Sequence, residues 1–175
     1  MLLVWTSTDG LDREQFSAVY RGSALESCRE MYPEEPTPQA ALARYEQEHL
    51  AYMDGPFFQE ERGLLFILAS REGRYRAAVK LYPWQGERRW HIEALETRPE
   101  DRGKGYGTQV LREMIARLEQ DGPVTLRSEV GNGNASSLHA HLKAGFRQRA
   151  EPVTERDGSV NDRQCIMVYQ SAGRG

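Results

Sequence analysis

The chain has 175 residues, of which 39% are hydrophobic and 28% charged, with a net charge of −3, a composition that predicts one ordinary globular domain over residues 1–175. A net acidic chain without a basic stripe of interleaved aromatic residues argues against a nucleic-acid partner, and no apolar run approaches the ~20 residues of a membrane span. Cys28 and Cys165 lie far apart without metal-ligand spacing, so we expect reduced thiols, no metal site and a cytoplasmic location.

The first 63 residues are expected to form a strand over residues 1–6, a helix over about 12–32 that Pro33 ends, and a second helix that begins near Pro38. Aromatic and apolar residues recur at helical spacing in the second helix. This stripe either faces the core or, because four of the eight tyrosines fall in this region, forms the aromatic wall of a substrate pocket. The residues concerned are Tyr20, Tyr32, Leu42, Tyr45, His49, Tyr52 and Met53.

The rest of the chain predicts a mixed sheet with one strand–helix–strand crossover between hairpins. The expected fold is α/β, with about seven strands and four helices. In chain order the elements are a hairpin of residues 64–70 and 75–82, a strand over 89–97, a glycine loop and a helix that Asp121-Gly122-Pro123 ends, a strand over 124–130, a short helix capped by Asn134 and ended by Gly145, and two strands, 146–153 and 164–169, that pair across a turn at 156–159.

Charge is divided unevenly along the chain. Residues 1–63 hold 12 acidic and 5 basic side chains, net −7, whereas residues 64–175 hold 14 and 18, net +4. One interpretation is that the acidic residues simply lie on solvated helix faces. The functional alternative is a basic part that holds an anionic cofactor and an acidic part that faces a cationic substrate.

The glycine loop carries the pattern R-x-x-G-x-G over residues 102–107, directly after a strand and before a helix. It fits neither nucleotide-binding motif, because Gly103-Lys104 is not followed by Ser or Thr and Thr108 stands where a dinucleotide fingerprint needs its third glycine. Bare backbone at a helix N-terminus can still surround a pyrophosphate with N–H groups. An ordinary glycine-rich turn is the alternative.

With residues 134–146, which begin at Asn134 and end in Lys143-Ala144-Gly145-Phe146, this loop resembles the two acetyl-coenzyme A signatures of the GCN5-related N-acetyltransferase (GNAT) family. The resemblance covers residues 64–169 and fades over residues 1–63, where family members differ and the acceptor is often selected. It implies a three-layer fold with a mixed, mostly antiparallel central sheet, in which the strands ending near residues 97 and 130 run parallel and splay apart.

By the same resemblance the cofactor is acetyl-CoA, used as a cosubstrate. Its pantetheine arm would lie along Leu95, Glu96 and Thr97, and its thioester would lie near Asn134. Arg102 and Lys104 would add positive charge. The complete set of cofactor-binding residues implied in this way is Leu95, Glu96, Thr97, Arg102, Gly103, Lys104, Gly105, Tyr106, Gly107, Thr108, Asn134 and Ser137.

Amide formation also needs a base for the amine and an acid for the departing thiolate. The family commonly has a tyrosine acid seven residues after the signature asparagine, and here that position is His141. His141 is either this acid or a buried histidine bonded to a carbonyl. The candidate bases are Glu129, Glu93 and His91, with Glu96 behind them; a relay through water is the alternative.

The expected function is an N-acetyltransferase that moves an acetyl group to a primary amine of a small molecule or peptide by direct attack in a ternary complex. The acidic first third of the chain suits a cationic acceptor. The alternative is a CoA-binding sensor or interaction protein that has lost turnover. The histidine in the position of the acid favours this alternative. Dimers are common in the family, so a homodimer is possible.

Overall fold

A computed structural model describes residues 1–154 and 157–172. Its main sheet has seven strands in the order β1-β2-β3-β4-β5-β9-β6, and β4 runs parallel to β5 while the other neighbours are antiparallel. The expected mixed sheet is therefore confirmed. Its strands are β1 (Leu2–Trp5), β2 (Leu64–Ala69), β3 (Tyr75–Pro83), β4 (Arg89–Thr97), β5 (Thr125–Gly131), β6 (Arg147–Gln148) and β9 (Gln164–Gln170).

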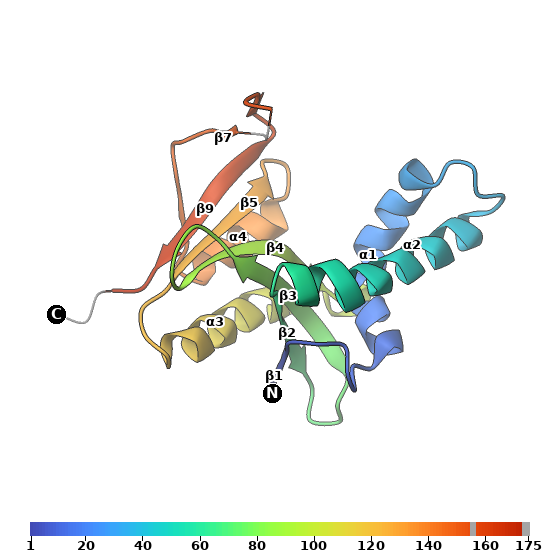
Figure 1. Cartoon of the computed structure of the whole chain (residues 1–175), viewed down its shortest axis with the longest axis horizontal. Helices are drawn as coiled ribbons and strands as arrows, with labels where there is room; N and C mark the ends of the chain where they lie inside the picture. Colours follow the sequence, from blue (N-terminus) through green and yellow to red (C-terminus); the bar gives the residue numbers. More distant parts are fainter. Residues whose placement is uncertain (155–156, 173–175) are drawn as a thin grey trace.

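Helices cover both faces of this sheet, as the three-layer expectation requires (Figure 1). Strand β2 shows the arrangement, because Phe66 and Leu68 pack into the core under α3 whereas Leu65 and Ile67 pack into the core under α1. The helices are α1 (Arg13–Met31), α2 (Pro38–Tyr52), α3 (Tyr106–Glu119) and α4 (Ala135–Lys143), with a one-turn 3-10 helix η2 (Pro99–Asp101) before α3.

The first two helices begin at capping side chains. The Asp12 side chain accepts a hydrogen bond from the Gln15 backbone N–H, and the Thr37 hydroxyl accepts one from Ala40. Such a cap is worth about 1 kcal/mol. Helices α1 and α2 lie side by side as a hairpin at one end of the sheet (Figure 1).

Strands β4 and β5 separate part-way along their length, which is the feature that makes room for a site. Their parallel pairing runs from Arg89–Thr125 to Ile92–Ser128. At the same level the register between β3 and β4 shifts, so that Glu93 is an extra, bulged residue. A bulge bends its strand, and the second half of β4 therefore leaves β5, as the family resemblance implied.

Two regions differ from the sequence expectations. Residues Met53–Glu60 continue α2 as a π-helix, η1, which contains Pro56, a residue that disfavours a regular α-helix at this point. The last hairpin is divided: β6 pairs with β9, while β7 (Val153–Thr154) and β8 (Val160–Asn161) form a separate two-stranded sheet. Residue 156 of the predicted turn lies outside the described residues. Within the described part, no helix is long and apolar enough to cross a membrane.

Candidate active site

The glycine loop connects β4 to α3. Gly103 and Gly105 have φ angles of 77° and 84°, a left-handed conformation that residues with a side chain adopt only with strain. Gly105 is also the N-cap of α3, so the first amides of that helix face the loop without helical partners. These N–H groups and the positive end of the helix dipole form a geometry that suits an anion.

Two cavities lie beside the glycine loop and beside the part of β4 that has separated from β5. The loop cavity, of about 190 Å³, lies over residues 101–108, and the inter-strand cavity, of about 440 Å³, lies between β4, α1 and the start of α4. Thr97, Arg102 and Gly107 line both. Eleven of the predicted cofactor residues line one cavity or both: Leu95, Glu96, Thr97, Arg102, Gly103, Gly105, Tyr106, Gly107, Thr108, Asn134 and Ser137.

A third cavity, also of about 440 Å³, lies between α1, α2 and the sheet. We call it the tyrosine cavity, because Tyr20, Tyr32, Tyr45 and Tyr52 all line it. Part of the aromatic stripe therefore lines a cavity, while Tyr20, Tyr32 and Met53 also belong to buried core clusters. Three carboxylates, those of Glu48, Glu93 and Glu96, lie among the rings.

The floor of the tyrosine cavity holds a buried cation. The Lys80 side chain is only 6% exposed, and its Nζ lies 3.1 Å from His49 Nε2 and 3.4 Å from Glu93 Oε2. Burial lowers the pKa of Lys80, and burial together with the Lys80 charge lowers the pKa of His49 to about 3. His49 is thus neutral and can accept a hydrogen bond from Lys80. Three rings surround the ammonium, with centroids 5.2–5.6 Å from Nζ: Tyr52, Tyr20 and Phe57.

Glu96 lies where the tyrosine cavity meets the inter-strand cavity. With Ser23 it lines both. Burial raises the pKa of Glu96 above its ordinary value, against the opposing effects of a hydrogen bond with Ser23 and the Arg102 charge. The Arg102 guanidinium is 3.9 Å away, at the limit of an ion pair. A carboxylate with a raised pKa between two cavities has the properties of a general base.

Comparison with known proteins agrees with this geometry. The family model described as "Acetyltransferase (GNAT) family" matches residues 25–146. The chain belongs to the GNAT acetyltransferase family.

Individual GNAT relatives are distant. The chain is 32% identical over 95 residues to the streptothricin acetyltransferase of Streptomyces lavendulae, which covers 53% of this chain and 49% of the relative. It is 33% identical over 64 residues to an L-methionine sulfoximine/L-methionine sulfone acetyltransferase of Pseudomonas aeruginosa, 37% of either chain. The alignments thus span less than half the length of these relatives. The PaiA N-acetyltransferase of Thermoplasma acidophilum, solved with coenzyme A, shares the fold, with a TM-score of 0.62, 16% identity, and coverage of 98% of this chain and 99% of that one.

His141 of this GNAT protein lies in the core. Its side chain is 1% exposed, its Nδ1 lies 2.8 Å from the Ser137 carbonyl oxygen, and its ring packs edge-on against Phe146. It lines none of the three cavities, and Nε2 has no hydrogen-bond partner among the described residues. This geometry corresponds to the buried histidine bonded to a carbonyl. Asn134 lines the inter-strand cavity, and its side chain caps α4 by accepting from the Ser137 N–H at 3.0 Å.

Of the other candidate bases, one lines a cavity and two do not. Glu93 lines the tyrosine cavity, where one carboxylate oxygen lies 3.0 Å from the Tyr52 hydroxyl. Glu129 forms a close ion pair with Arg127 on β5, and the His91 ring stacks on Tyr82. Neither Glu129 nor His91 lines the three cavities described above.

Sequence reasoning missed two features of the site and included one residue that lies outside the cavities. Ser23 and Glu26 of α1 line the inter-strand cavity, and neither was among the predicted site residues. Lys80 lies between Val79 and Leu81 in β3, and a charge between two apolar strand residues is a signal that could have indicated it. Lys104, predicted as a cofactor-binding residue, lines none of the three cavities; its Nζ lies 2.9 Å from Asp101 Oδ1.

Proposed function

We propose that this protein is an acetyl-CoA-dependent N-acetyltransferase for a primary amine of a cationic small molecule or peptide. The observation that carries the proposal is the meeting of two cavities at Glu96, one beside the glycine loop and one lined by tyrosines and carboxylates. An acyl donor in the inter-strand cavity and an amine in the tyrosine cavity would then meet at a buried carboxylate.

The donor side follows from charge and backbone geometry. The amides of residues 103–108 would bind the pyrophosphate, and the main chain of residues 95–97, beyond the part of β4 that pairs with β5, would lie along the pantetheine arm. Arg102 would add positive charge from the wall that the loop and inter-strand cavities share. A backbone N–H of this segment would stabilise the oxyanion of the acetyl carbonyl.

The acceptor side follows from the lining of the tyrosine cavity. Three carboxylates face one lysine there, and the tyrosine rings can pack against a cation. The acidic excess of residues 1–63, which contribute α1 and α2, adds to the attraction of a cationic amine.

The chemical step needs a single proton carrier. Glu96 would take a proton from the amine, whose nitrogen forms a bond to the acetyl carbon while the carbon–sulfur bond breaks. The protonated carboxyl would then return the proton to the thiolate of coenzyme A. No covalent enzyme intermediate is required, and His141 has no part in this sequence because it lies in the core.

Release of free thiol from acetyl-CoA with a panel of polyamines, aminoglycosides and amino acids tests the activity. The proposal expects release with cationic acceptors. Binding of acetyl-CoA without release with any acceptor would contradict it and favour a CoA-binding sensor.

Three matched variants test the base. Glu96→Gln should lower kcat by at least about 100-fold and remove the acidic limb of the pH–rate profile, as is usual for loss of a general base. Glu93→Gln keeps the shape of its side chain in the tyrosine cavity, and Glu129→Gln serves as the distant control; both should keep the acidic limb. Loss of that limb in either of them, with its retention in Glu96→Gln, would move the base to that residue.

A further inference from the structure

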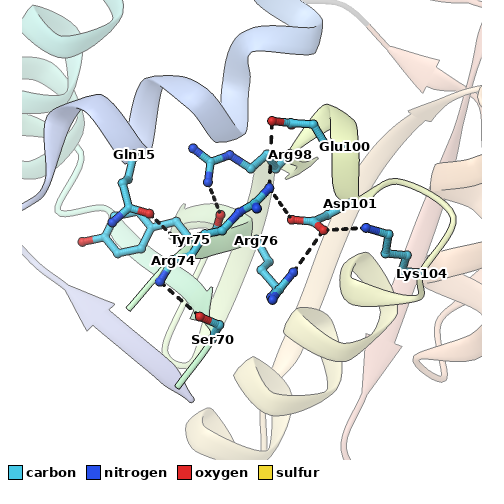
Figure 2. Close-up of polar contacts among 9 residues, drawn as sticks. All are labelled: Gln15, Ser70, Arg74, Tyr75, Arg76, Arg98, Glu100, Asp101 and Lys104. Atoms are coloured by element: carbon cyan, nitrogen blue, oxygen red, sulfur yellow. Dashed lines mark hydrogen bonds and ion pairs between the residues drawn. The ribbon is translucent and has the colours of Figure 1, made fainter. Parts of the chain in front are cut away.

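A buried carboxylate lies directly before the glycine loop, at Asp101, the last residue of η2. Its side chain is 2% exposed, and three cations converge on it (Figure 2). Arg76 Nη1 and Lys104 Nζ lie 3.0 and 2.9 Å from Oδ1, and Arg74 Nη2 lies 3.3 Å from Oδ2. The cations come from three segments: the start of β3, the turn before it and the glycine loop itself.

The ionised state of Asp101 is secured by these partners. Burial alone would oppose ionisation, but the hydrogen bond from Lys104 and the charges of Lys104, Arg74 and Arg76 outweigh it, so the pKa of Asp101 lies below its ordinary value. The buried carboxylate keeps its charge only because cations surround it. Removal of that charge would leave these cations close together without a counter-charge.

Two of the three cations connect Asp101 to the loop and to the start of α3. Lys104 is the residue between Gly103 and Gly105, both of which have positive φ. The Arg76 guanidinium bonds Asp101 and lies over the ring of Tyr106, 5.1 Å from its centroid, at the first position of α3. Asp101 therefore connects the middle of the loop and the start of the helix to β3.

This connection matters because glycines leave a loop free to adopt many conformations. A loop that must order itself around a ligand loses affinity in doing so, whereas one already fixed does not. The loop cavity includes Asp101, Gly103 and Gly105 in its wall. Fixing Lys104 between the two glycines therefore restricts the backbone where the amides face that cavity.

We propose that Asp101 is a positioning residue that holds the glycine loop in its anion-binding conformation, through Lys104 on the loop and Arg76 against the ring of Tyr106. The inference rests on the proposed function in one respect: the ligand of the loop is taken to be the pyrophosphate of acetyl-CoA. It assigns Lys104 to the scaffold of the loop, not to direct contact with the phosphates.

The test compares Asp101→Asn with Glu100→Gln. Glu100 is the neighbouring carboxylate, 66% exposed and 3.9 Å from Arg74, and is a matched control for the loss of one negative charge. Two quantities are measured: the Kd of acetyl-CoA by calorimetry, and the rate of backbone hydrogen exchange over residues 102–107 in the absence of cofactor.

Asp101→Asn should weaken acetyl-CoA binding by about 10-fold or more and speed exchange of the loop amides, with kcat at saturating cofactor and the KM of the acceptor nearly unchanged. Glu100→Gln should match the wild type in both measurements. Wild-type Kd and wild-type loop exchange in Asp101→Asn would overturn the proposal, as would a fall in kcat alone.

If Asp101→Asn does not fold, the variant Arg76→Met tests the positioning role instead. That variant removes the contact with Tyr106 and leaves Asp101 with Arg74 and Lys104, so it should shift both measurements in the same direction by a smaller factor; no shift would overturn the proposal. Failure of the wild type to bind acetyl-CoA would overturn the proposed function instead. In that case the hydrogen-exchange rates of residues 102–107 in the wild type and the variants would still test the positioning role.

Discussion

Replacement of Gly107 by alanine should change stability and cofactor affinity in opposite directions. Gly107 lies in the first turn of α3 with an ordinary helical φ, so alanine there is favoured by up to about 1 kcal/mol. An added Cβ would lie 3.4 Å from Thr97 Oγ1 and 3.9 Å from Ala140 Cβ, at about the contact limit, so the fold has room for it. For a protein of this size the gain corresponds to a rise in Tm of about 2–4 °C.

The same methyl group would occupy space that the cofactor needs. Gly107 lines both the loop cavity and the inter-strand cavity, and the added Cβ would lie between β4 and α4. We expect Gly107→Ala to bind acetyl-CoA at least about 10-fold more weakly, a loss of about 1.4 kcal/mol or more.

Calorimetric titration with acetyl-CoA and thermal unfolding without it measure the two effects. Gly55→Ala is the matched control, because Gly55 is in η1, has no heavy atom within 4 Å of an added Cβ, and lines none of the three cavities. It should leave affinity unchanged. Wild-type affinity in Gly107→Ala would refute the placement of the cofactor between β4 and α4.

Two further predictions concern buried titratable groups. Burial lowers the pKa of His141 and keeps the ring neutral in the folded protein, whereas the unfolded chain takes up a proton below about pH 6.5. The wild type should therefore lose unfolding free energy between pH 7.5 and pH 5. His141→Phe should lose less in urea titrations over the same range, and its turnover should stay within about 2-fold of the wild type. A fall in turnover of about 10-fold would return His141 to the chemistry. The pKa of Asp101 is lowered instead, so its contribution is complete above its unfolded value of 3.8 and is lost as the pH falls through the lower folded value. The stability difference between the wild type and Asp101→Asn should accordingly be larger at pH 6 than at pH 2; an equal difference at both would contradict an ionised Asp101 held by its cations.

The parts of the fold and site that could be predicted from sequence depend on local signals. Asp12 and Pro38 mark helix starts through capping and a fixed φ, and these signals act within a few residues. The glycine loop is likewise contiguous, since two positive-φ glycines and the start of α3 lie within residues 103–106. Such features need no knowledge of what packs against them.

The choice among the carboxylates of β4 depends on a bulge that the alternation of side chains does not reveal. In a regular strand neighbouring residues face opposite sides. Here Glu93 and Ala94 line the same cavity as Glu96, because the register shifts at Glu93. An assignment by alternation is therefore wrong beyond that point.

Asp101 shows a second limit of sequence reasoning. Two of its partners, Arg74 and Arg76, are about 25 residues away along the chain and reach it only because β3 and β4 pair. His141 shows a third, since helical spacing predicts an inward side chain without indicating whether a core or a cavity lies there.

A crystal structure of the protein with acetyl-CoA bound would locate both ends of the cofactor. We expect the pyrophosphate to accept hydrogen bonds from the backbone amides of residues 103–108, and the acetyl group to lie at the junction of the two larger cavities, beside Glu96. Acetyl-CoA bound away from the glycine loop, or with its acetyl group remote from Glu96, would contradict this expectation.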